Sequence, residues 1–133
     1  MSSENSPSRR SPLATPPAET PGHGLLAGRQ AVVTAAAGTG IGFSTARRIL
    51  LEGGDVLISD WHERRLGEAR AKLAEEFPER TVAQLTCNVQ ETAEVDALIA
   101  GAVGELGRID VLVNNAGLGG QTPRSIRAAR RWA

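Results

Sequence analysis

A glycine-rich turn follows the first apolar run of the chain. Its residues read Thr34-Ala35-Ala36-Ala37-Gly38-Thr39-Gly40-Ile41-Gly42. Small side chains let a backbone approach a phosphate closely, and a helix that begins here would direct its free N–H groups and the positive end of its dipole at that anion. The pattern favours a pyrophosphate-binding turn over the alternative, a glycine-rich turn that binds nothing.

An acidic residue follows the next apolar run at a distance that suits a nucleotide site. Asp60 lies 18 positions after Gly42 and directly after Val56-Leu57-Ile58-Ser59. A carboxylate there can accept hydrogen bonds from the ribose hydroxyls of adenosine and would repel a 2′-phosphate, so we expect NAD to be preferred over NADP. Two nearby cations, Arg64 and Arg65, keep NADP from being excluded. The alternative is an aspartate that only stabilises the start of a helix.

These residues need alternating strands and helices to bring them together, and the hydrophobic pattern predicts such an alternation. Strands are expected at Gln30–Thr34, Asp55–Ser59, Thr81–Cys87 and Ile109–Val113, and helices at Ile41–Glu52, Leu66–Phe77 and Val95–Leu106. Right-handed βαβ units then give a Rossmann-type, doubly wound α/β fold with a parallel sheet, truncated to about four strands in the order 3-2-1-4. The last strand, a continuous apolar run, is expected to be buried on both faces.

Composition limits the class of protein. The 133 residues suit one small domain, basic and acidic residues balance at 15 each, and Cys87 is the single cysteine. No apolar run approaches the ~20 residues that span a bilayer. We therefore expect no nucleic-acid or membrane partner, no metal site and no disulfide framework, and a cytoplasmic location.

The two ends of the chain differ from its centre. Residues 1–24 are rich in proline and serine and carry almost no large apolar side chains, so we expect a disordered tail. Residues 25–120 form the predicted, partial dinucleotide-binding domain. Residues 121–133 form a basic tail with four arginines after Pro123. We interpret it as an out-of-frame or truncated end, with a short basic helix as the alternative.

The fourth predicted strand is followed by a distinctive tetrapeptide, Asn114-Asn115-Ala116-Gly117. Between about Leu26 and Gly120 the chain resembles the short-chain dehydrogenase/reductase family. The motifs that carry this resemblance are Ala36-x-x-x-Gly40-x-Gly42, Asp60, Asn88-Val89 and the tetrapeptide itself.

The resemblance implies a role for the glycine-rich turn. Gly40, Ile41 and Gly42 would line the pyrophosphate and the ribose on the nicotinamide side. Ala36 stands where the family has its first glycine, and Gly38 adds flexibility nearby. If the backbone at Ala36 requires a positive φ, its methyl group costs about 1 kcal/mol.

The resemblance also implies how the adenosine half is held. Asp60 would bind the ribose, and Asn88 and Val89 would flank the adenine ring, with Asn88 standing where the family usually has aspartate. Three further residues would stabilise the sheet and border the cofactor: Asn115, Ala116 and Gly117.

The chemistry of the family requires residues that this sequence does not place. In the family a serine, a Tyr-x-x-x-Lys pair and an asparagine lie in a further ~100 residues, where the tyrosine exchanges a proton with the substrate while hydride moves to or from nicotinamide. The 133 residues include no tyrosine. We therefore expect an NAD(P)-dependent oxidoreductase that acts on a small secondary alcohol or ketone only in a longer parent, with this chain inactive by itself.

Two other classes were weighed. One is a catalytically inactive dinucleotide-binding or regulatory module, which the same motifs permit. The other is a Rossmann-type methyltransferase, which is disfavoured because Ala36 and Ala37 stand where that class usually has an acidic residue. Family members commonly form oligomers, and the assembly of this chain stays open. Because strand four is interior in the family, we expect the isolated chain to expose an apolar strand edge and to aggregate.

Overall fold

Strands and helices alternate along residues 15–118, the part of the chain that the structure, a computed structural model, describes. In chain order the elements are β1 (Gln30–Val33), α1 (Ile41–Leu51), β2 (Asp55–Asp60), α2 (Glu63–Glu76), β3 (Val82–Thr86), α3 (Thr92–Leu106) and β4 (Val111–Val113). All four strands are parallel, in the order β3-β2-β1-β4. The predicted Rossmann-type fold and strand order are confirmed. Within these residues no helix is both long and apolar enough to cross a membrane.

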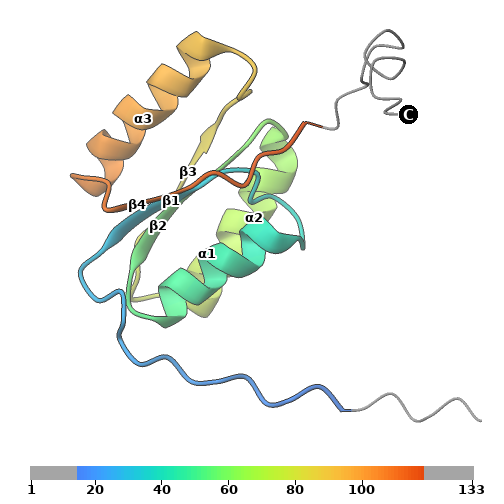
Figure 1. Cartoon of the computed structure of the whole chain (residues 1–133), viewed down its shortest axis with the longest axis vertical. Helices are drawn as coiled ribbons and strands as arrows, with labels where there is room; N and C mark the ends of the chain where they lie inside the picture. Colours follow the sequence, from blue (N-terminus) through green and yellow to red (C-terminus); the bar gives the residue numbers. More distant parts are fainter. Residues whose placement is uncertain (1–14, 119–133) are drawn as a thin grey trace, which may run out of the picture.

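The sheet separates two apolar layers (Figure 1), with α1 and α2 on one face and α3 on the other. Successive residues of a strand point to opposite faces, so Ile58 belongs to the cluster under α1 and α2 while Leu57 belongs to the cluster under α3. Both side chains are fully buried. The central strands therefore hold the residues at their carboxyl ends on a rigid base.

The beginning of α2 lies three residues before the first apolar position of the predicted helix. His62 caps this helix, because its Nδ1 accepts a hydrogen bond from the backbone N–H of Arg65 at 3.4 Å. A cap of this kind satisfies an N–H group that has no partner within the helix. The cap, and not the apolar spacing, sets where α2 begins.

The expectation that the fourth strand is buried on both faces is wrong for the described chain. Val111 and Val113 are half-buried, and Leu112 is 45% exposed. The physical reason is that β4 pairs with β1 alone among the described strands, and α3 packs mainly on β2 and β3. The predicted apolar stripe of α3 is also only partly buried, since Val103 is 45% exposed. Aggregation through the free edge of β4 stays a prediction.

An extended segment that precedes β1 lies against the end of α1. The Glu52 carboxylate is almost fully buried and accepts the backbone N–H groups of His23 at 2.8 Å and Leu25 at 3.1 Å, and it also pairs with Arg48. These donors hold the pKa of Glu52 below its ordinary value, the His23 and Leu25 N–H groups most strongly. Part of the segment predicted to be a disordered tail therefore contacts the domain, while residues 1–14 lie outside the described chain.

Candidate functional site

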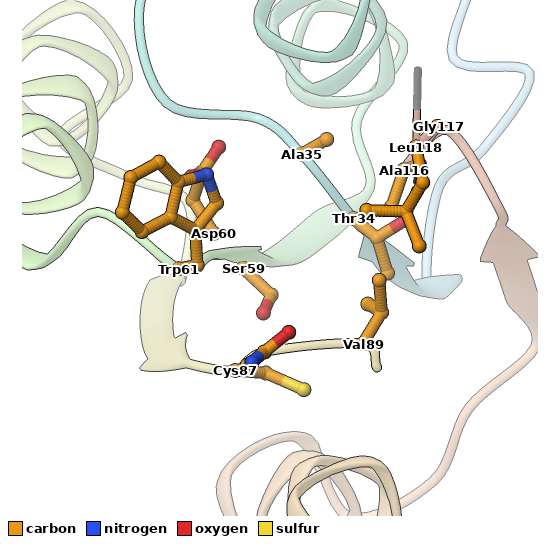
Figure 2. A pocket seen from close by; sticks show the side chains of 11 residues that line it. Thr34, Ala35, Ser59, Asp60, Trp61, Cys87, Val89, Ala116, Gly117 and Leu118 are labelled. Atoms are coloured by element: carbon orange, nitrogen blue, oxygen red, sulfur yellow. Dashed lines mark hydrogen bonds between the residues drawn. The ribbon is translucent and has the colours of Figure 1, made fainter. Parts of the chain in front are cut away.

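A cavity of about 140 Å³ opens where the strands end (Figure 2). It is lined by residues at or just beyond the carboxyl ends of all four strands: Thr34, Ala35, Ser59, Asp60, Trp61, Cys87, Asn88, Val89, Ala116, Gly117 and Leu118. Helices switch from one face of the sheet to the other between β1 and β4. In open parallel sheets, ligands bind outside the carboxyl ends of the strands at such a switch point.

The turn after β1 takes a conformation that the sequence left undecided. Ala35 has φ 52° and Gly38 has φ 95°, both in the left-handed region. Ala36 has no positive φ; it is fully buried in the core, and its N–H donates to the carbonyl of Ser59 at 3.0 Å. The condition considered for Ala36 is therefore not met, and the strain lies one residue earlier, at Ala35, whose methyl group costs about 1 kcal/mol there.

The Thr34 hydroxyl joins the end of β1 to the segment after β4. It accepts the backbone N–H groups of Asn115 and Ala116, each at 3.0 Å, and donates to the carbonyl of Val113 at 3.3 Å. The Asn115 side-chain amide donates to the carbonyl of Ala35 at 3.2 Å. Asn115 thus acts here on the backbone of the turn, and Thr34, which sequence reasoning passed over, connects the end of β1 to the segment that follows β4.

The glycines of the turn differ in what surrounds them. A methyl group at Gly42 would lie 2.4 Å from the carbonyl oxygen of Ala35 and 2.7 Å from Nδ2 of Asn115, so this glycine is needed for packing. A methyl group at Gly40 would meet nothing within 4 Å, and Gly40 has an ordinary φ of −85°. A methyl group at Gly117 would likewise meet nothing within 4 Å. Neither backbone conformation nor packing explains the absence of a side chain at Gly40.

The start of α1 has no side-chain cap. Gly40 occupies the N-cap position, and no side chain of the described residues caps the N–H groups of the first turn. The first N–H groups of a helix have no partner inside it, and together with the helix dipole they form a site for an anion. Gly40 and Ile41 line a second hollow, beside α1, and Ile41 is 78% exposed.

Asp60 ends β2 and faces the glycine-rich turn. Its Oδ2 accepts the N–H of Ala37 at 3.2 Å, and its Oδ1 accepts the N–H of His62 at 3.1 Å. The cap of α2 is His62 and not Asp60, and the alternative, an aspartate that only stabilises the start of a helix, stays open. A carboxylate can accept about four hydrogen bonds, so Asp60 keeps acceptor capacity toward the cavity that it lines.

Asn88 and Val89 follow β3 and line the same cavity. The Asn88 Oδ1 accepts the N–H of Gln90 at 3.1 Å, which leaves its amide NH₂ group as a donor. Val89 is 37% exposed. Figure 2 places Asp60 and Trp61 on one side of the cavity, across from Val89.

The predicted site residues divide into two groups. The cavity brings together Asp60, Asn88, Val89, Ala116 and Gly117. The others lie in the turn and its supports, outside the cavity lining: Ala36, Gly38, Gly40, Ile41, Gly42 and Asn115.

Sequence reasoning missed six lining residues, namely Thr34, Ala35, Ser59, Trp61, Cys87 and Leu118. Most of them neighbour a predicted site residue at a strand end, which is the signal that could have found them. Trp61 follows Asp60 directly, and its indole is 73% exposed at the cavity. Burial raises the pKa of the Cys87 thiol, so this group is neutral at pH 7.

Comparison with known proteins agrees with this geometry. The sequence model of the family described as short chain dehydrogenase matches residues 29–133. The chain belongs to the short-chain dehydrogenase family. The match extends across the basic tail, for which no family-like pattern was recognised; residues 119–133 lie outside the described chain.

Individual members of the short-chain dehydrogenase family resemble the chain closely. It is 58% identical to a (5R,7aS)-5-hydroxy-7a-methyl-1-oxo-2,3,5,6,7,7a-hexahydro-1H-indene-carboxyl-CoA reductase of Mycobacterium tuberculosis, over 90% of this chain and 45% of the relative. It is 61% identical to a crystal structure of a short chain dehydrogenase from Mycobacterium smegmatis, with a TM-score of 0.76 over 82% of this chain and 45% of that one. The chain therefore spans less than half the length of these relatives.

More distant family structures carry either form of the cofactor. An NAD⁺-bound xylitol dehydrogenase is 31% identical, with a TM-score of 0.66 over 72% of this chain and 36% of that one. An L-sorbose reductase from Gluconobacter frateurii complexed with NADPH and L-sorbose is 33% identical, with a TM-score of 0.66 over 71% and 35%. The choice between NAD and NADP is therefore not decided by family membership.

Proposed function

We propose that this chain binds NAD at the carboxyl edge of its sheet, as the cofactor-binding part of an oxidoreductase. The observation that carries the proposal is Gly40. It has an ordinary backbone conformation, open space where a side chain would be, and uncapped helix N–H groups beside it. A position kept free of a side chain next to an anion site supports close approach of a pyrophosphate.

The proposed ligand fits the residues on either side of this turn. The pyrophosphate would lie against Gly40 and the first turn of α1, while Asp60 would accept hydrogen bonds from the adenosine ribose. The base would enter the cavity between Trp61 and Val89, which line it from β2 and β3. Toward β4, Gly117 leaves open space at the border of the ligand.

We propose that NAD is preferred because Asp60 is the one charged residue among those that line the cavity in the described chain. A 2′-phosphate would meet this carboxylate directly. Arg65 lines a hollow on the other side of the turn, beside Gly38, where it could contact a phosphate if Asp60 were absent.

Calorimetric titration with NADH and NADPH tests this preference. We expect wild type to bind NADH at least about tenfold more tightly than NADPH, a difference of ~1.4 kcal/mol. Asp60→Ser should narrow or reverse the ratio, and Asp60→Ser combined with Arg65→Ala should weaken NADPH again. Equal affinities of wild type for NADH and NADPH would overturn the proposed preference for NAD. If wild type bound neither ligand, the proposed binding site would be overturned.

The proposed reaction belongs to a longer parent protein. Bound NAD supplies the nicotinamide ring that accepts or releases a hydride. The parent would interconvert a secondary alcohol and a ketone, and the 133 residues, which contain no tyrosine, would bind the cofactor without turnover. Steady oxidation of NADH by this chain with ketone substrates would contradict the proposal that these 133 residues bind the cofactor without turnover. The alternative, a catalytically inactive binding module, is not favoured, because the similar proteins are named as a reductase and a dehydrogenase.

A further inference from the structure

We infer that Ser59 is a specificity-determining residue whose hydroxyl hydrogen-bonds the base of the bound dinucleotide. This inference rests on the proposed function and names a contact that the glycine-rich turn and Asp60 do not supply. Ser59 is 1% exposed at the penultimate position of β2, directly after three fully buried apolar residues. A hydroxyl in such a strand needs a partner.

The main chain of Ser59 has a hydrogen-bond partner, and its side chain has none among the described residues. The carbonyl accepts the N–H of Ala36 at 3.0 Å. Among the side-chain hydrogen bonds between the described residues, none uses the Ser59 hydroxyl, although no enclosed polar side-chain atom there lacks a partner. The open space beside Ser59 is the cavity that it lines.

The orientation of Ser59 differs from that of its neighbour Asp60. Side chains alternate along a strand, and Figure 2 shows the Ser59 oxygen pointing away from the Asp60 carboxylate, toward the space beside Cys87 and Val89. Cys87 is a buried, neutral thiol and a weak donor. This end of the cavity thus offers the Ser59 hydroxyl and the Asn88 amide as hydrogen-bonding groups in uncharged surroundings.

Uncharged surroundings decide which part of a dinucleotide belongs there. A phosphate would lose its hydration without a compensating cation, whereas a purine is neutral, flat and rimmed by donors and acceptors. A hydroxyl can both donate and accept, so it suits a purine edge, either directly or through one water. The exposed Trp61 ring and the Val89 side chain supply apolar contact surface in the same cavity.

The test compares wild type, Ser59→Ala and a control, Thr81→Ala. Thr81 is exposed and precedes β3 at the opposite edge of the sheet, so its hydroxyl is remote from the cavity. Dissociation constants are measured for NADH and for two competitors, AMP, which carries the base, and inorganic pyrophosphate, which does not. Thermal unfolding of each variant monitors the fold.

We expect Ser59→Ala to weaken NADH and AMP by about fivefold to tenfold, the effect of one hydrogen bond to a neutral group. Pyrophosphate binding and the unfolding temperature should match those of wild type and Thr81→Ala. Unchanged NADH and AMP affinities overturn the inference while leaving the proposed function intact. A parallel loss for pyrophosphate overturns it too, because the effect would then not concern the base. If wild type fails to bind NADH at all, the proposed function falls, and the inference with it.

Discussion

The Thr34 hydroxyl accepts the backbone N–H of Asn115 at 3.0 Å and thereby ties the end of β1 to the segment that follows β4. The same oxygen accepts the N–H of Ala116. Replacing the hydroxyl by a methyl group in Thr34→Val leaves both N–H groups without this partner. We predict a loss of about 2 kcal/mol in the free energy of unfolding, measured with urea.

Thr34→Ser is the matched control for this prediction, because it keeps the oxygen and removes only a methyl group. It should retain most of the stability. Equal losses in Thr34→Val and Thr34→Ser would show that packing, and not the hydroxyl, is responsible.

Gly42 and Gly40 make a matched pair for separating packing from ligand approach. Gly42→Ala places a methyl group 2.4 Å from the carbonyl oxygen of Ala35, so the turn must shift, at about 1–3 kcal/mol of stability. Gly40→Ala meets open space, so it should cost no more than the roughly 1 kcal/mol expected when alanine replaces glycine at an N-cap. It should nevertheless weaken NADH binding, because the methyl group fills the space reserved for the pyrophosphate. Loss of stability without loss of binding in Gly40→Ala would contradict this assignment.

Ala35 stores strain that a single substitution should release. Its φ of 52° lies in the left-handed region, which costs an alanine about 1–2 kcal/mol and costs glycine little. The greater freedom of glycine in the unfolded chain offsets up to ~1 kcal/mol of that gain. We predict that Ala35→Gly stabilises the protein by about 0.5 kcal/mol in equilibrium unfolding. A clear destabilisation would mean that the turn has a different conformation.

The order of the strands and the position of Asp60 could be predicted from sequence, because both follow from local patterns. Alternating apolar runs determine the elements, and an acidic residue directly after a strand must lie at the carboxyl edge. The strain at Ala35 could not be predicted in this way. It depends on the path of the whole turn. Two hydrogen bonds fix that path: the N–H of Ala36 donates to the carbonyl of Ser59, and the side-chain amide of Asn115, which follows β4, donates to the carbonyl of Ala35.

The burial of β4 was mispredicted for a related reason. An apolar sequence such as that of Val111–Val113 indicates that a strand can be covered, but the cover must come from other elements. Trp61 and Ser59 were missed because neither residue type is diagnostic by itself. Their importance appears only when the ends of β2 and β3 lie side by side around one cavity.

Glu52 should make stability depend on pH. Its carboxylate form is favoured in the folded protein by the N–H groups of His23 and Leu25 and by Arg48, so its folded pKa is lower than the ordinary value of 4.5. This contribution is complete above pH 4.5 and is lost as the pH falls through the lowered pKa. Glu52→Gln should therefore be less stable than wild type near pH 7, and its unfolding temperature should fall less between pH 6 and pH 3.

Two other carboxylates with lowered pKa, Glu19 and Asp110, contribute in the same direction and remain in the variant. The dependence of the unfolding temperature on pH should thus be weaker in Glu52→Gln than in wild type, but it should not disappear. Parallel curves of unfolding temperature against pH for wild type and Glu52→Gln would contradict the role assigned to the buried carboxylate.

The central claim is that a dinucleotide occupies the carboxyl edge of the sheet, and mapping NADH onto the backbone amides by NMR titration tests it most directly. The account predicts saturable shifts at the strand ends and at the start of α1, above all at Gly40, Asp60, Asn88 and Gly117. The amide resonances of Leu73 in α2 and Leu98 in α3, both buried away from the site, should not shift. No saturable shifts, or shifts confined to surfaces remote from these strand ends, would contradict the account.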